Sequence, residues 1–296
     1  MFCGLFRVNQ NLGVNHKMSS GILYLISTPI GNLGDISQRA ISVLKEVNVI
    51  AAEDTRHSQR LLNHLGIRGH MRAYHEHNES RQAPLLVDLL EQGDSVALIS
   101  DAGTPLVSDP GYRLVELAHR HNIKVVPVPG ACAAIAALSV AGLATDRFVF
   151  EGFPPAKQGV RLKYLAGLEN EQRTMVFYIS CHRIVETLSD MRQVFGENRQ
   201  ATFAREITKA YETVRKATLG EIHAWVRDDE QQRKGEIVLV IAGAEQKERG
   251  EMDLDNMLSV LIEELPVKQA AKIASRLSGV NKNDLYKAAL KLKGGS

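Results

Sequence analysis

The sequence predicts two α/β domains followed by a small helical module. Short β-branched runs alternate with amphipathic helical runs five times after Gly21, and a second set of such runs begins near residue 147. The charge pattern then changes after Gly243. Alternation of this kind is typical of βαβ units with a mainly parallel sheet. The 296 residues are enough for two domains with full cores.

We place the first domain at residues 21–146. Its strands are expected at 22–28, 49–54, 71–77, 95–100 and 124–129. Its helices are expected at 37–47, 57–66, 80–93, 113–121 and 131–142, where apolar residues recur every three or four positions. Ligands of open sheets bind beyond the carboxyl ends of the strands. The loops that begin at Pro29, Thr55, Asp101 and Pro129 should therefore meet at one edge.

We place the second domain at residues 147–243. Its strands are expected at 147–153, 174–180, 200–207, 212–219 and 235–243, and its helices at 161–170, 182–196 and 220–230. Two neighbouring strand runs are joined by only a short link around residues 209–212. Because parallel neighbours need a long crossover, this link predicts a mixed sheet.

The last module, residues 244–296, is divided by charge. Residues 244–265 carry seven acids and two bases, whereas residues 266–296 carry seven bases and one acid. Helices expected at 266–279 and 282–293, joined by a glycine-containing turn, resemble a helix-turn-helix. A basic face of this kind suits RNA, although two solvated helices would show the same pattern. The net charge of +2 alone does not indicate a nucleic-acid partner.

Composition limits the class of protein. Three scattered cysteines give neither a disulfide framework nor metal-ligand spacing, so no metal is expected and a reducing cytoplasm fits. No apolar stretch reaches the roughly 20 residues that cross a bilayer, and we expect no membrane association. Residues 1–20 lack the apolar core of a signal peptide. We interpret them as a disordered extension, in which Met18 is a possible natural start.

The segment LISDAGTPLVSDPGY at 98–112 joins an expected strand to an expected helix. It has neither the G-x-G-x-x-G of dinucleotide folds nor the lysine of phosphate-binding loops. Its glycines allow close approach of a ligand to the backbone, so it suits an adenosine-like and amino-acid-like ligand better than a triphosphate. Asp101, at the strand end, is expected to bind that ligand, although a capping role is the alternative. Asp109, before Pro110, is expected only to shape the turn.

Two other polar segments follow strands. YHEHNE at 74–79 could suggest a metal, but no other His/Cys cluster completes a zinc site. Polar substrate contacts are the better interpretation there. In AAEDTRHS at 51–58, Asp54 or Thr55 is expected to cap a helix, which would direct Arg56 and His57 outward.

Eight segments together resemble the ribosomal small subunit methyltransferase I family of the tetrapyrrole methyltransferase superfamily. They are TPIGNL, AAEDTRH, YHEHNE, SDAGTPLVSDPG, PVPG, EGFPPAK, AREITK and KGEIVLV, in this order. The resemblance covers about residues 21–243 and the helical tail. It implies two α/β domains with a cleft between them, a homodimer, and methyl transfer from S-adenosylmethionine to the ribose 2′-hydroxyl of a cytidine in 16S ribosomal RNA.

The resemblance also implies residues that bind the cofactor. The methionine part would lie on the loop Ser100, Asp101, Ala102 and Gly103, and a second turn would contribute Ala131 and Cys132. Tyr178 and Ala204 match positions near the adenine. One departure concerns YISCHR, where Ile179 stands in place of a glutamate common in the family, while His182 and Arg183 are retained.

Methyl transfer to a hydroxyl needs alignment and is helped by a base. We consider Glu53, His75 and Glu79 as weak catalytic candidates, with Glu206 a further acid at the same edge. RNA is expected to contact six basic residues: Arg56, Arg205, Lys209, Lys268, Lys272 and Arg276. The RNA would be 16S ribosomal RNA within the small subunit. Two alternatives are a methyltransferase of the same fold acting on a tetrapyrrole and a non-catalytic RNA-binding protein.

Overall fold

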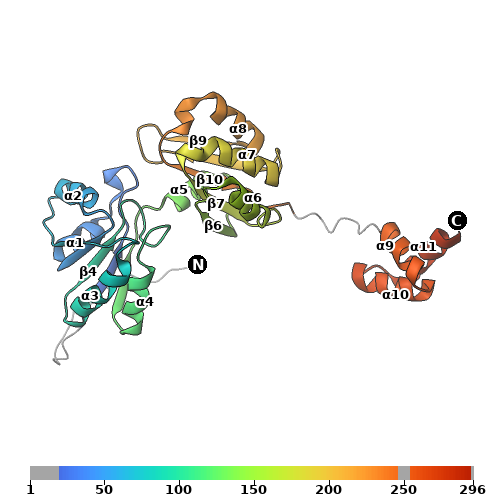
Figure 1. The fold of residues 1–296 in the computed structure, drawn as a ribbon, viewed down its shortest axis with the longest axis horizontal. Coiled ribbons are helices and arrows are strands. Elements are labelled where there is room, and N and C mark those ends of the chain that lie inside the picture. The colour runs from blue at the N-terminus through green and yellow to red at the C-terminus, as the bar shows by residue number, and fades with distance from the viewer. Residues whose placement is uncertain (1–19, 246–253, 295–296) are drawn as a thin grey trace, which may run out of the picture. The chain divides into compact units, whose positions relative to one another are not determined.

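The computed structural model describes residues 20–245 and 254–294 (Figure 1). The chain divides into two compact units, with the boundary between Ala242 and Gly243. The first unit holds two five-stranded sheets and the second holds three helices. The expected extension at residues 1–20 lies outside the described residues, apart from its last one. None of the described helices is long and apolar enough to span a membrane.

The first sheet is entirely parallel, with the order β3-β2-β4-β1-β5. Its strands are β1 (Ile22–Ile26), β2 (Val49–Ala52), β3 (Met71–Ala73), β4 (Val96–Ile99) and β5 (Lys124–Val128). The crossover helices are α1 (Gln38–Glu46), α2 (Thr55–His64), α3 (Glu79–Glu91) and α4 (Tyr112–Arg120). A short 3₁₀ helix, η1 (Leu33–Asp35), precedes α1.

Both faces of this sheet are buried because successive strand residues point to opposite sides. Leu23 and Leu98 pack with α3 and α4 on one face. Ile26 and Ile99 pack with α1 and α2 on the other. Burial on both sides explains why β2 and β4 are apolar throughout, as the sequence predicts.

The second sheet is mixed, as predicted, with the order β6-β7-β10-β8-β9. Only β6 and β7 are parallel, because β10 runs antiparallel to both of its neighbours and β9 to β8. The strands are β6 (Phe148–Gly152), β7 (Thr174–Ile179), β8 (Gln200–Arg205), β9 (Thr213–Thr218) and β10 (Ile237–Ile241). The helices are α6 (Gln158–Ala166), α7 (Ile184–Phe195), α8 (Leu219–Asp228) and the 3₁₀ turns η2 (Cys181–Arg183) and η3 (Glu230–Arg233).

Helices cover both faces of the second sheet too. Residues of α6, α7 and α8 pack on the face that carries Phe177, Phe203 and Leu239. The opposite face, which carries Val176 and Val240, packs against α5 (Ala133–Val140). The helix that follows the last strand of the first sheet therefore completes the core of the second.

The second unit consists of α9 (Leu254–Glu264), α10 (Val267–Ser278) and α11 (Lys282–Gly294). Its core includes Leu258, Ala271, Ala274, Leu285 and Ala289. Gly279 ends α10 in the left-handed conformation, with φ of 74°, as glycine does at many helix ends. The predicted pair of helices with a glycine turn is therefore present.

One predicted element is shorter than expected. The strand predicted at 71–77 ends at Ala73, and the histidines after it lie in a turn. The Asn78 side chain accepts a hydrogen bond from the His75 N–H and donates one to the Ala73 carbonyl. These bonds replace the ladder that a longer strand would form. His75 and His77 consequently do not share a strand face.

Candidate active site

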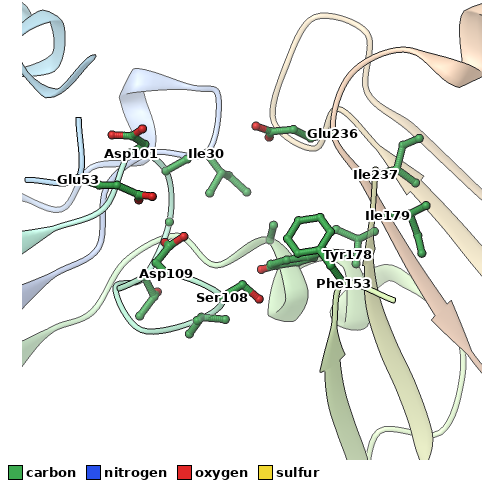
Figure 2. Close-up of a pocket in the computed structure, with 16 residues that line it drawn as sticks. Ile30, Glu53, Asp101, Ser108, Asp109, Phe153, Tyr178, Ile179, Glu236 and Ile237 are labelled. Carbon is green, nitrogen blue, oxygen red and sulfur yellow. The ribbon is translucent and has the colours of Figure 1, made fainter. Parts of the chain in front are cut away.

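A pocket of about 280 Å³ lies at the carboxyl ends of the first-sheet strands and is closed by residues of the second sheet (Figure 2). This is the place where open α/β sheets hold ligands. The volume is close to the lower end of the range for small-molecule sites. The wall comprises Ile30, Glu53, Asp101–Thr104, Val107–Asp109, Ala133, Phe153, Tyr178, Ile179 and Glu236–Val238.

Hydrogen bonds join three loops into one rim. The N–H of Thr28 donates to the Gly103 carbonyl at 2.9 Å, and the N–H of Gly103 donates back at 3.1 Å. The Thr104 hydroxyl donates to the Ala131 carbonyl at 3.0 Å and lies 2.9 Å from the Ser27 hydroxyl. The loops after β1, β4 and β5 are thus held together by their own hydrogen bonds, and such preorganisation lowers the entropy lost on binding.

The loop after β4 contains unusual backbone geometry. Leu106 and Ser108 have φ of 72° and 67°, in the left-handed region that non-glycine residues rarely adopt. Gly111 has φ of 139°, and a Cβ there would lie 2.8 Å from the Leu98 side chain. Left-handed non-glycine residues cost about 1–3 kcal/mol each and cluster at functional sites. The strain supports a binding role for this loop.

The pocket wall is acidic on one side. It contains the carboxyl groups of Glu53, Asp101, Asp109 and Glu236, and no lining residue is a lysine, arginine or histidine. Figure 2 shows the first three on the side of the first sheet. No group of His, Cys, Asp or Glu within the described ranges is arranged to hold a metal ion. The wall therefore favours an organic cation and disfavours phosphates.

Burial raises the pKa of the Glu53 carboxyl above its ordinary value, and the nearby charges of Asp109 and Asp101 raise it further. Burial also raises the pKa of Asp109, against a hydrogen bond with Ser100 that lowers it, and Asp101 adds to the rise. Desolvation and like charge both penalise the ionised form. A cation in the pocket would relieve both effects.

The opposite side of the pocket is mainly apolar and aromatic, with Glu236 at its margin (Figure 2). Tyr178 of β7 accepts a hydrogen bond from the Ala134 N–H at 3.2 Å, and burial raises the pKa of its phenol. Its ring lies edge-on to Phe150 and Phe153, with centroids 5.0 and 5.5 Å away. A ligand with a cationic part and a planar part matches this division of the wall.

Comparison with known proteins agrees with this geometry. Residues 22–223 match the Tetrapyrrole (Corrin/Porphyrin) Methylases, and residues 248–293 match the RsmI C-terminal HTH domain. The chain is 51% identical over 283 residues to ribosomal RNA small subunit methyltransferase I of Pseudomonas aeruginosa, covering 94% of this chain and all of that protein. This identity decides the family. The chain belongs to the ribosomal RNA small subunit methyltransferase I family.

Other relatives agree with this membership. The enzyme of the same name from Escherichia coli O157:H7 is 51% identical, over 93% of this chain and 97% of that protein. Among solved structures, a cobalt precorrin-4 methyltransferase matches with a TM-score of 0.55 at 16% identity, over 78% of this chain and 98% of that one. These matches confirm the predicted tetrapyrrole methylase fold with its additional helical module.

The structure brings half of the predicted cofactor-binding residues into the pocket wall. Asp101, Ala102, Gly103 and Tyr178 line it. The other predicted residues do not, and they are Ser100, Ala131, Cys132 and Ala204.

Three of the remaining four residues support the wall. Ser100 is buried and hydrogen-bonds Asp109, and the Ala131 carbonyl accepts the bond from Thr104 described above. Cys132 immediately precedes α5 and lies beside Tyr178. These contacts hold the lining residues in place.

Ala204 does not line the pocket. It is fully buried in β8, because α5 and the neighbouring strand cover it, and its partner Val238 on β10 lines the pocket instead. Ile179, the departure from the family, also lines the pocket and continues into the apolar core behind it.

Of the three catalytic candidates, only Glu53 lines the pocket. Glu79 lies at the start of α3, with its carboxylate 3.4 Å from the Tyr74 hydroxyl. The Nε2 of His75 lies 3.0 Å from the Asn78 amide. Neither side chain lines the pocket, and both contact residues of the turn that ends β3, so the expectation that they act beside Glu53 is not supported. Glu206 is paired with Lys209 at 2.8 Å and does not line the pocket either.

The predicted RNA-binding residues differ in their exposure to solvent and in their ion pairs. Arg56, at the start of α2, has a side chain that is 91% exposed, and Asp54 caps that helix as predicted. Lys209 forms ion pairs with Glu206 and Glu236, which neutralise much of its charge. The basic residues of α10 are all exposed at four-residue spacing, and they are Lys268, Lys272 and Arg276.

Arg205 requires a correction. It is only 8% exposed, and its guanidinium donates to Gln232, to Thr213 and to the carbonyls of Tyr211 and Lys234. Because those bonds use its donors inside the protein, Arg205 stabilises the loops between the outer strands and is not available to RNA.

Three pocket residues were missed or misjudged from sequence. Asp109 was expected only to shape a turn, yet its carboxyl lies in the wall. The predicted strand ranges include Phe153 and Glu236. In the structure Phe153 follows the last residue of β6 and Glu236 precedes the first residue of β10, and both line the pocket. The glycine before Phe153 and the two prolines after it were the available signal for a loop.

Proposed function

We propose that this protein transfers a methyl group from S-adenosylmethionine to the ribose 2′-hydroxyl of a cytidine in 16S ribosomal RNA of the small subunit. The acidic and aromatic pocket beside the glycine-containing loop carries the proposal. Family membership at 51% identity supports it. The predicted activity, donor and RNA substrate all follow from that membership together with the pocket.

The pocket residues fit the methyl donor. S-adenosylmethionine, when bound, supplies an electrophilic methyl carbon on a positively charged sulfur. The carboxylates of Asp101 and Asp109 would hold the cationic part, and backbone groups of Ala102 and Gly103 lie within the same wall. Tyr178 would contact the planar adenine. The absence of basic residues from the lining fits a donor that has no phosphate.

The reacting hydroxyl must be aligned with the methyl carbon. Alignment can supply about 7–11 kcal/mol of the barrier, whereas a general base contributes about 10²–10⁴-fold, or roughly 3–5 kcal/mol. Positioning is therefore the larger effect. Glu53 is the residue that would accept the ribose proton, because it lines the pocket and its pKa is raised toward the working pH.

RNA binding requires a second surface. A nucleotide of folded RNA must turn outward to reach a pocket of this size. Exposed Arg56 and the basic face of α10 would bind the phosphate backbone, whose contacts supply most sequence-independent affinity. Since the substrate is the small ribosomal subunit, we place the reaction in the cytoplasm.

The active form would be a homodimer. The apolar helix α5 exposes 51% of Ile135 and 53% of Val140, which would be covered in a symmetric pair. Sedimentation of the full chain tests this, and a monomer at micromolar concentration would contradict it.

The decisive experiment incubates the full chain with labelled S-adenosylmethionine and small subunits from cells that lack this modification. Label at a cytidine ribose is expected. Label only in an added tetrapyrrole would support the alternative of a same-fold methyltransferase for small substrates. Failure to bind the methyl donor would support a non-catalytic RNA-binding protein.

A further inference from the structure

Phe153 is exposed although it lines the pocket. Its exposed fraction is 57%, whereas Ile179 and Ile237 of the same wall are each 3% exposed. Single exposed apolar side chains are common, but a large exposed aromatic ring that also lines a pocket is a candidate ligand contact. Figure 2 shows the ring beside Tyr178 at the second-sheet side of the pocket.

The segment that carries Phe153 is anchored from inside the protein. Arg161 is 1% exposed and donates from Nη1 to the carbonyls of Ala156 at 3.0 Å and Pro155 at 3.3 Å. Its Nε donates to the buried Asp190 carboxylate at 2.7 Å. Burying an ion pair costs free energy. Because the buried Arg161 also donates to two carbonyls of this loop, the position of the loop is closely constrained.

A second set of contacts holds the other side of Phe153. The Tyr164 hydroxyl donates to the Glu151 carboxylate at 2.5 Å. Gly152 has φ of 63°, and a Cβ there would lie 3.5 Å from the Ser108 hydroxyl. The chain is therefore anchored on both sides of Phe153, and Gly152 lies close to the strained loop after β4.

From this geometry we infer that Phe153 is the surface on which the base of the target nucleotide stacks when it enters the pocket. This inference rests on the proposed function, because it requires an RNA substrate. Flipped and single-stranded bases are commonly bound by stacking on aromatic side chains. A ring that is carried on an anchored segment and packs edge-on against Tyr178 loses less entropy when the base arrives than a ring on a mobile loop.

The exposure of Phe153 separates this role from that of the cofactor site. Tyr178 accepts a hydrogen bond from the Ala134 N–H, lies beside Cys132 and is less exposed than Phe153. In the proposed function the adenine of the methyl donor lies against Tyr178, so the donor occupies this more buried part of the wall. The nucleotide arrives from solvent and meets the exposed ring first.

The test compares Phe153→Ala, Phe153→Leu and Phe153→Trp in the full chain. Stacking on one aromatic is worth about 5–150-fold in affinity. We expect Phe153→Ala and Phe153→Leu to lower kcat/KM for undermethylated small subunits by about 10–100-fold, and Phe153→Trp to retain the wild-type value. Affinity for S-adenosylmethionine, measured by calorimetry, is expected to change less than about 3-fold in all three.

Phe148→Ala is the matched control, because Phe148 is also an exposed phenylalanine (39%), lies at the opposite end of β6 and does not line the pocket. It should keep wild-type kcat/KM. Full activity of Phe153→Ala, or equal losses in RNA methylation and donor affinity, would overturn the inference. Wild-type protein that places no label in ribosomal RNA would instead contradict the proposed function. Thermal unfolding of each variant shows whether any loss comes from misfolding.

Discussion

The Oδ1 of Asp101 accepts a hydrogen bond from the backbone N–H of Asp54 at 3.0 Å. This bond joins the end of β4 to the start of α2 and holds Glu53, the residue before Asp54, at the pocket wall. Asp101 therefore has two separable properties. Its oxygen fixes a loop, and its carboxylate lines the pocket where we propose that the methyl donor binds.

Asp101→Asn should separate these properties. Asparagine keeps an oxygen that can accept from Asp54, but it removes the charge. Hydrogen bonds to charged groups contribute about 1.5–3 kcal/mol, so we expect a loss of roughly 10–150-fold in affinity for S-adenosylmethionine. Calorimetry measures the affinity, and thermal unfolding should show a melting temperature close to wild type. Asp101→Ala should lose both affinity and stability, and an unaltered affinity in Asp101→Asn would show that the charge is not used.

Asp109→Asn should stabilise the free protein. The pKa of Asp109 is raised in the folded state, so its contribution to stability is present below the unfolded pKa and is lost as pH rises through the folded pKa. Removal of the charge should therefore add about 0.5–2 kcal/mol to the free energy of unfolding near pH 7.5, and little near pH 4. Urea unfolding at both pH values measures this. The variant should also bind the methyl donor more weakly. An equal gain in stability at both pH values would show that the ionised Asp109 carboxylate does not destabilise the free protein.

Glu53→Gln tests the proposed base. We expect kcat to fall about 10²–10⁴-fold with little change in donor affinity. In the wild type, kcat should decrease as pH falls through the raised pKa of Glu53, because the protonated carboxyl cannot accept a proton. This acidic limb should be missing from the residual activity of the variant. A loss of donor affinity without a loss of kcat would make Glu53 a binding residue only.

The basic face of α10 is expected to set the salt dependence of RNA binding. Each phosphate contact contributes about −0.7 to the log–log salt slope for single strands. Joint replacement of Lys268, Lys272 and Arg276 by alanine should reduce the slope by about 2 and leave donor binding unchanged. Lys124→Ala is the control, because this exposed lysine starts β5 at the opposite edge of the sheet from the pocket. Equal slopes for wild type and the triple variant would show that α10 contacts another partner.

Arg205→Ala should act on stability. The change leaves the carbonyls of Tyr211 and Lys234 without the buried donor that they now have. Hydrogen bonds to charged groups contribute about 1.5–3 kcal/mol each, and water can replace part of the loss at these partly buried carbonyls, so we expect the free energy of unfolding to fall by about 2–4 kcal/mol. Denaturant titration measures this loss. At a temperature where the variant is folded, its salt slope should equal that of the wild type, and a reduced slope would restore Arg205 as an RNA contact.

Local pattern was sufficient for most of the fold. The strands and helices of both sheets follow from the period of apolar residues, and the short link before β9 is sufficient to predict a mixed sheet. The strand predicted at 71–77 is too long, because it ends at Ala73 in the structure. The Asn78 side chain forms hydrogen bonds with the backbone of Ala73 and His75, and these bonds compete with the hydrogen bonds between strands. Periodicity does not reveal such competition.

The sequence by itself determined the alternation of elements, the edge at which ligands bind, and the glycine-containing loop with Asp101. Those properties depend on neighbours along the chain and on the parallel arrangement that alternation imposes. Only the tertiary structure decided that Arg205 is internal, that Asp109 faces the pocket and that Phe153 is exposed on an anchored loop. These outcomes depend on contacts between distant residues, such as Arg161 with Asp190, and burial is a property of the packed chain that no local segment contains.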